Sequence, residues 1–99
     1  MSLNDLRVSL LIVLQAGLLR MITPNIRGVT CAVNEQKIQL KFVYEGPYSE
    51  EDEEDCDDVA TEVIAYFPDH QVDLQIVSME ISDPIDGQML GDWAYLRKE

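Results

Sequence analysis

The sequence predicts one α+β domain, residues 1–99, in which the elements follow the order αββαββ and two helices pack on one face of a four-stranded antiparallel sheet. Three observations support this fold class: an apolar segment that begins with a helix cap, an alternating segment interrupted by a turn, and an acidic segment with apolar residues at helical spacing. Ninety-nine residues provide one hydrophobic core and are too few for two.

The first predicted helix covers residues 3–22. Ser2 followed three residues later by Asp5 is the sequence of a capping box, and Pro24 ends a helix by about Ile22. The polar stripe of this helix is narrow and consists of Asn4, Arg7 and Gln15. A helix this apolar must be covered on more than one side, by the sheet and by either the second helix or a partner chain.

A hairpin follows in the segment VTCAVNEQKIQLKFVY. If Asn34-Glu35 is a two-residue turn, Val33 pairs with Gln36. The alternative is a loop that is longer by two residues, and it leaves the same side chains on each face of the hairpin. The buried face then consists of Val29, Cys31, Val33, Ile38, Leu40 and Phe42. The face that we expect to contact water consists of Thr30, Ala32, Lys37, Gln39 and Lys41.

The second helix begins after Ser49, with Asp52 at the capping-box position, and Pro68 ends it. Its inward stripe follows helical spacing and consists of Cys56, Val59, Ala60, Val63 and Phe67. The segment VDLQIVSM from Val72 alternates as a third strand, and LGDWAYLRK supplies a short fourth strand.

The charge balance limits the possible partners. Nineteen Asp and Glu residues stand against seven Lys and Arg, so the net charge is −12. Such a field repels nucleic acid and anionic membranes and attracts basic proteins. The composition therefore excludes nucleic-acid and membrane binding as functions of this chain.

The apolar stretch VSLLIVLQAGLL is too short for a membrane span of ~20 residues, because Gln15 and Arg20 interrupt it. Asp5 before the apolar run and the missing small-residue cleavage site argue against a signal peptide. Cys31 and Cys56 fit no disulfide framework and lie on apolar faces, which predicts reduced, buried thiols and a cytoplasmic localisation.

Eight carboxylates occupy the nine positions 50–58. In the first helical turn, Glu50 to Glu53 are stabilised by the helix dipole, but this benefit does not extend to Glu54, Asp55, Asp57, Asp58 and Glu62. Like charges four residues apart, as in Glu51 with Asp55 and Glu54 with Asp58, repel each other. On a helical wheel the side opposite the inward stripe carries the acidic ridge, Glu51, Glu54, Asp58 and Glu62. This ridge is either a partner-binding surface or only a solvated face.

Catalytic and metal sites are not indicated. A calcium loop needs spaced ligands and a glycine at its sixth position, whereas these carboxylates are contiguous, so we expect neither metal nor cofactor. His70, the one histidine, follows Pro68-Asp69 in a connection and has no nucleophile at a suitable spacing. We therefore expect a non-enzymatic protein; an enzyme would require a pocket of polar groups around His70.

Two aromatic residues are candidate interface anchors, Tyr48 before the second helix and Trp93 in the last strand. If Leu90, Ala94 and Leu96 point inward, Trp93 and Tyr95 point outward together. The opposite parity buries Trp93 in the core, and both arrangements are open at this point.

Three stretches, LRMITPNIRGVT, PYSEEDEEDCDDVATEVIAYFPD and LGDWAYLRKE, together resemble small acidic bacterial immunity-type proteins of αββαββ layout that are encoded beside contact-dependent or polymorphic toxins. The resemblance covers most of the chain and includes no catalytic signature. It implies a cytoplasmic protein that binds and blocks a toxin domain in contact-dependent growth inhibition.

The first hypothesis is thus an inhibitor of a basic toxin domain, with a nuclease as the expected class. The residues predicted to bind this partner are Tyr48, Glu50, Glu51, Glu54, Asp55, Asp58, Glu62 and Trp93. The alternative is a structural, self-associating cytoplasmic domain that forms a homodimer through its first helix and uses the acidic face only for solubility.

Overall fold

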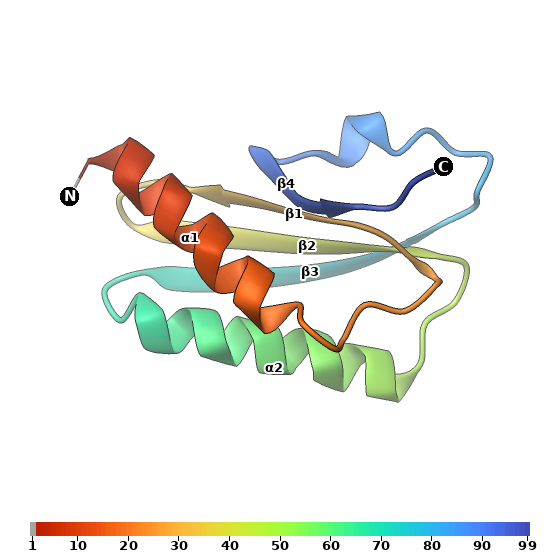
Figure 1. Cartoon of the computed structure of the whole chain (residues 1–99), viewed down its shortest axis with the longest axis horizontal. Helices are drawn as coiled ribbons and strands as arrows, with labels where there is room; N and C mark the ends of the chain where they lie inside the picture. The colour runs from red at the N-terminus through yellow and green to blue at the C-terminus, as the bar shows by residue number, and fades with distance from the viewer. Residues whose placement is uncertain (1) are drawn as a thin grey trace.

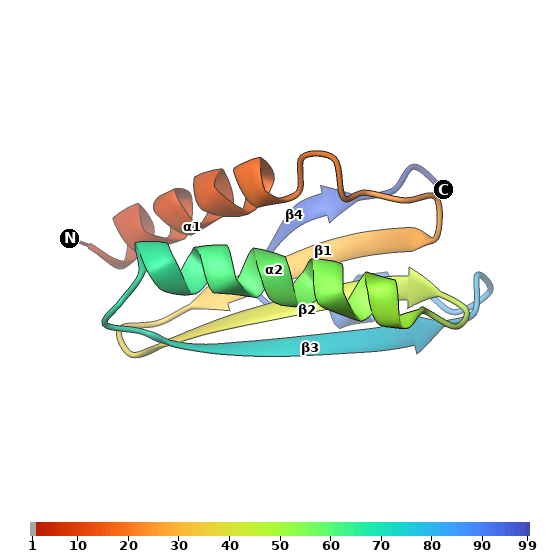
Figure 2. The ribbon, with the colours of Figure 1, turned by 90° about the horizontal axis from the view of Figure 1, so that it is seen from below.

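The computed structural model describes residues 2–99 and confirms the αββαββ order, with one short 3₁₀-helix added (Figure 1). The elements are α1 (Leu3–Gly17), β1 (Ile26–Val33), β2 (Lys37–Glu45), α2 (Glu50–Tyr66), β3 (Gln71–Met79), η1 (Asp86–Gln88) and β4 (Asp92–Leu96). Both α-helices lie on the same face of the sheet, as predicted (Figure 2).

The prediction of a fully antiparallel sheet is wrong. The strand order is β3-β2-β1-β4, and β1 is antiparallel to both neighbours, but β3 is parallel to β2. The reason is the connection between them, because α2 carries the chain back along the sheet to the end where β2 began. Gln71 therefore pairs with Lys37, and both strands run in the same direction.

The β1–β2 hairpin has the longer of the two loops considered. Val33 pairs with Ile38, and the Asn34 side-chain oxygen accepts hydrogen bonds from the backbone N–H groups of Gln36 (2.9 Å) and Lys37 (2.7 Å). This side-chain turn explains why Asn serves here without a following glycine. The buried face is the predicted one.

Helix α1 ends at Gly17, five residues before the predicted end at Ile22. After the cap at Leu18 the chain reverses through Arg20, whose φ of 71° is left-handed. The Met21 N–H donates to the Leu18 carbonyl at 3.2 Å and closes this turn. The helix therefore stops at a local turn before the chain reaches Pro24.

Both predicted capping boxes are present. In α2 the Asp52 N–H donates to Ser49 Oγ at 3.1 Å, and the Ser49 N–H donates to Asp52 Oδ2 at 2.9 Å. The inward stripe of α2 is buried as predicted, and with α1 it covers a core formed by Leu10, Leu14, Leu18, Ile26, Val29, Cys31, Ile38, Leu40, Phe42, Tyr44, Cys56, Val59, Ala60, Val63 and Phe67.

The second face of the hairpin is covered in part, contrary to the prediction of a wet face. Thr30 is fully buried, and the segment before β4 contacts this face of the sheet. The Thr30 hydroxyl donates to the Asp92 carbonyl (2.7 Å) and accepts from the Leu90 N–H (2.9 Å). Lys41 donates to the Gln88 side chain at 2.9 Å, whereas Gln39 stays exposed.

Candidate functional site: the acidic face of α2

Helix α2 concentrates negative charge on its outer side. Its seventeen residues include nine carboxylates and no basic residue. The helix forms despite this repulsion because its inward stripe is buried and its first turn is capped. Of the predicted partner-binding carboxylates, those exposed to solvent are Glu50, Glu51, Glu54, Asp58 and Glu62, and Asp55 is half-buried.

No neighbouring cation neutralises this helix within residues 2–99. The five ion pairs found there join Arg7 to Asp92, Arg27 to Glu99, Lys37 to Asp73, and Arg97 to both Glu45 and Glu99. All of these pairs lie on α1, the sheet or the C-terminal tail, and none includes a residue of α2. The charge of α2 is therefore available to an external partner.

One member of the acidic ridge lies apart from the others. A Cβ added to Gly17 would meet Glu62 Oε2 at 3.1 Å and Val59 at 3.5 Å, so the Glu62 carboxylate lies at the junction of α2 with α1. Glu51, Glu54 and Asp58 continue along the fully solvated side of α2. The ridge thus extends from open solvent to the boundary between the two helices.

Beneath the N-terminal half of α2, Tyr44 and Cys56 contact each other in the core, with Oη and Sγ 3.4 Å apart. Burial raises the pKa of the Cys56 thiol to about 11, and burial also raises the pKa of Tyr44. The predicted anchor Tyr48 packs on Tyr44, with ring centroids 5.4 Å apart, and is half-buried. Tyr48 therefore lies just before the N-terminal end of α2, with part of its side chain exposed to solvent.

Trp93 lies on the other side of the sheet. It pairs with Thr30, whereas Tyr95 pairs with Val29, so Ala94 is an extra residue on β4. This bulge places Tyr95 against the core on the helix side of the sheet and Trp93 over Gly28 on the opposite side. Both arrangements considered from the sequence kept strict alternation along this strand, and neither separated the two aromatic rings. One flat partner surface cannot contact both Trp93 and the acidic ridge.

The two cysteines and His70 make contacts within the fold. Burial raises the pKa of the Cys31 thiol to about 12, and both cysteines are free and buried as predicted. His70 Nε2 lies 3.0 Å from the Asn34 carbonyl oxygen, and its ring packs edge-on against Phe67. From Ser2 to Glu99, no three His, Cys, Asp or Glu side chains are grouped as metal ligands.

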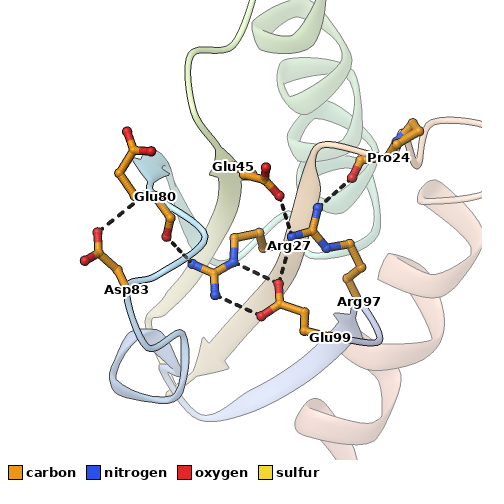
Figure 3. Close-up of polar contacts among 7 residues, drawn as sticks. All are labelled: Pro24, Arg27, Glu45, Glu80, Asp83, Arg97 and Glu99. Atoms are coloured by element: carbon orange, nitrogen blue, oxygen red, sulfur yellow. Dashed lines mark hydrogen bonds and ion pairs between the residues drawn. The ribbon is translucent and has the colours of Figure 1, made fainter.

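A buried polar network that the sequence did not indicate fixes the C-terminal tail (Figure 3). Arg27, 2% exposed, donates to both carboxylate oxygens of Glu99 at 2.8 Å and to the Glu80 carbonyl at 3.0 Å. Arg97 donates to Glu45 at 2.7 Å and to Glu99 at 2.9 Å. Arg27 holds the pKa of Glu99 down to about 2. The network is internally satisfied, which indicates a structural role.

In residues 2–99, none of the helices has the length and apolar character required to cross a membrane. No curated protein matches the chain at a significant level. A family model described as MafI2 immunity protein matches residues 7–99, which cover α1 from Arg7 onward, all of α2 with its acidic face, and all four strands. This match confirms the resemblance to immunity-type proteins, and the chain belongs to the MafI2 immunity protein family.

Proposed function

We propose that this chain protects its cell by binding a toxin domain with a basic surface, through the acidic face of α2, and without catalysing a reaction. The contacting side chains in this proposal are Glu50, Glu51, Glu54, Asp55, Asp58 and Glu62, with Tyr48 at the edge. The single observation that carries it is a helix with nine carboxylates and no cation paired to any of them in residues 2–99. Family membership supports a toxin as the partner.

A nuclease is the toxin class that this surface suits best. Nucleases hold the phosphates of their substrate in basic clefts, and a row of fixed carboxylates can occupy such a cleft in place of phosphates. Complementary fields also increase the association rate, from about 10⁵–10⁶ to as much as 10⁸–10⁹ M⁻¹s⁻¹ at low salt. Fast association suits a protein that must act before its toxin does. The two free thiols are consistent with protection in the cytoplasm.

Self-association through α1 is the second candidate. It is favoured by apolar side chains of α1 and the following turn that remain exposed, among them Ile12 at 63% and Leu19 at 73%. Light scattering at several concentrations distinguishes a monomer from a dimer. A monomer would remove this candidate.

The test of the proposed function compares two triple charge reversals. Glu51→Lys with Glu54→Lys and Asp58→Lys changes the ridge, whereas Glu35→Lys with Asp69→Lys and Asp86→Lys changes exposed carboxylates elsewhere and alters net charge equally. Each variant is co-expressed with candidate toxin domains, and the cognate toxin is the one from which the wild-type chain protects growing cells.

We expect the ridge variant to lose protection and the control variant to retain it. Circular dichroism must show that both variants are folded, and no large change is expected because the reversed side chains are exposed. Full protection by a folded ridge variant would refute a role for this face.

A further inference from the structure

The two helices touch near one end and diverge toward the other (Figure 1). Close contact is possible at Gly17 because it has no side chain; an added Cβ would lie 3.1 Å from Glu62 Oε2. Toward the N-terminal half of α1 the helices separate and leave a groove of about 330 Å³. It is lined by Ser9, Ile12, Val13, Tyr66 and Phe67.

This groove is apolar and its walls are open to solvent. Ile12 is 63% exposed on the α1 side, and Tyr66 is 69% exposed on the α2 side. Phe67 forms a buried floor that is continuous with the core, and the polar side-chain groups of the lining are the hydroxyls of Ser9 and Tyr66. Two large, exposed apolar side chains facing one groove are typical of a protein-docking surface.

Charge decides between a second copy of this chain and a basic partner as the occupant. Glu62, at the junction of the helices, lies one helical turn before Tyr66, so the groove adjoins the acidic ridge. A second copy would bring another net charge of −12 and its own α2 carboxylates toward this rim. A basic surface instead gains attraction from the same carboxylates while an apolar side chain fills the groove.

We propose that the groove between α1 and α2 receives an apolar side chain of the toxin that is flanked by Lys or Arg residues. This inference rests on the proposed function and extends it, because it gives the two parts of the surface different roles. The acidic ridge accelerates encounter, and the groove holds the docked complex, since buried apolar anchors act mainly on dissociation.

Binding kinetics test this division of roles. The probe is the toxin domain from which the chain protects cells, immobilised and exposed to purified wild-type and variant chains. Ile12→Ala and Tyr66→Ala truncate the two exposed walls, and Ile81→Ala is the matched control, because Ile81 is 54% exposed on the connection after β3. We expect each groove variant to dissociate about tenfold faster or more, with association within about twofold of wild type. The control should not change either rate.

Failure of this inference is distinguishable from failure of the proposed function. Wild-type dissociation in both groove variants, together with slow association of the ridge variant, would overturn the groove and leave the ridge proposal intact. Unchanged association of the ridge variant would overturn the proposed function itself. A wild-type dimer that Ile12→Ala converts to a monomer would show that a second copy occupies the groove and would also overturn the inference.

Discussion

Replacing Glu99 by Gln removes the charge that compensates a buried guanidinium and changes the shape of the side chain very little. Arg27 is 2% exposed and has three hydrogen bonds in this network, two to Glu99 and one to the Glu80 carbonyl. The variant therefore leaves a buried cation without its counter-ion. We expect Glu99→Gln to destabilise the fold while leaving the acidic face of α2 unchanged.

The magnitude follows from the geometry. Removing one partner of a fully buried ion pair costs about 3–5 kcal/mol. The Glu99 side chain is 25% exposed, the Gln amide retains one acceptor, and Arg27 keeps its bond to the Glu80 carbonyl, so we expect a smaller loss of about 2 kcal/mol. For a domain of this size that loss lowers Tm by about 8–16 °C.

The pH dependence has a definite sign. The ion pair with Arg27 lowers the pKa of Glu99 to about 2 in the folded chain, and an unfolded Glu titrates at about 4.3. A depressed carboxyl pKa stabilises the fold above the unfolded value, and this contribution is lost as the pH falls toward the folded value. The difference in free energy of unfolding between wild type and Glu99→Gln should therefore be largest near neutral pH. It should decrease as the pH falls from about 5 to about 2.

Urea unfolding followed by circular dichroism measures this difference. The control is Asp73→Asn, because Lys37 and Asp73 also form a 2.8 Å ion pair, but their side chains are 40% and 44% exposed. We expect the control to unfold close to the wild-type midpoint. Equal midpoints for Glu99→Gln and wild type, with the same pH dependence, would refute the stabilising role of the network.

Three further predictions concern packing, capping and thiol reactivity. Gly28→Ala should destabilise by about 1–3 kcal/mol, since its Cβ would lie 2.7 Å from the Trp93 ring, and a changed tryptophan fluorescence spectrum would report the shift. Ser49→Ala should cost about 1 kcal/mol in urea unfolding because it removes the α2 cap; no loss would show that the capping box is dispensable. Cys31 and Cys56, with pKa values raised to about 12 and about 11, should react with a thiol reagent only after unfolding, and rapid labelling of the native chain would contradict their burial.

Features that depend on residues close in sequence were predictable. The two capping boxes require residues three positions apart, and the inward stripe of α2 follows helical spacing, so both could be read directly. The acidic ridge was visible for the same reason. The early end of α1 was missed because the left-handed turn at Arg20 uses a residue that carries no turn signal.

Features that depend on tertiary arrangement were not predictable. The direction of β3 is set by the path of α2 across the sheet, and alternation within a strand is the same in either direction. The bulge at Ala94 reverses the facing of Tyr95 relative to Trp93, yet no Gly or Pro marks it. The groove between the helices requires their relative placement, of which Gly17 is the only local sign.

The association rate with the cognate toxin, measured from about 0.05 to 0.5 M salt, tests the central claim most directly. Wild type should associate fastest at low salt and slow steeply as salt rises. The ridge variant, Glu51→Lys with Glu54→Lys and Asp58→Lys, should associate at least about tenfold more slowly at low salt and depend little on salt. The control with reversals at Glu35, Asp69 and Asp86 should remain much closer to wild type. Equal rates and equal salt dependence for the two triple variants would contradict the account, because net charge alone would then explain the attraction.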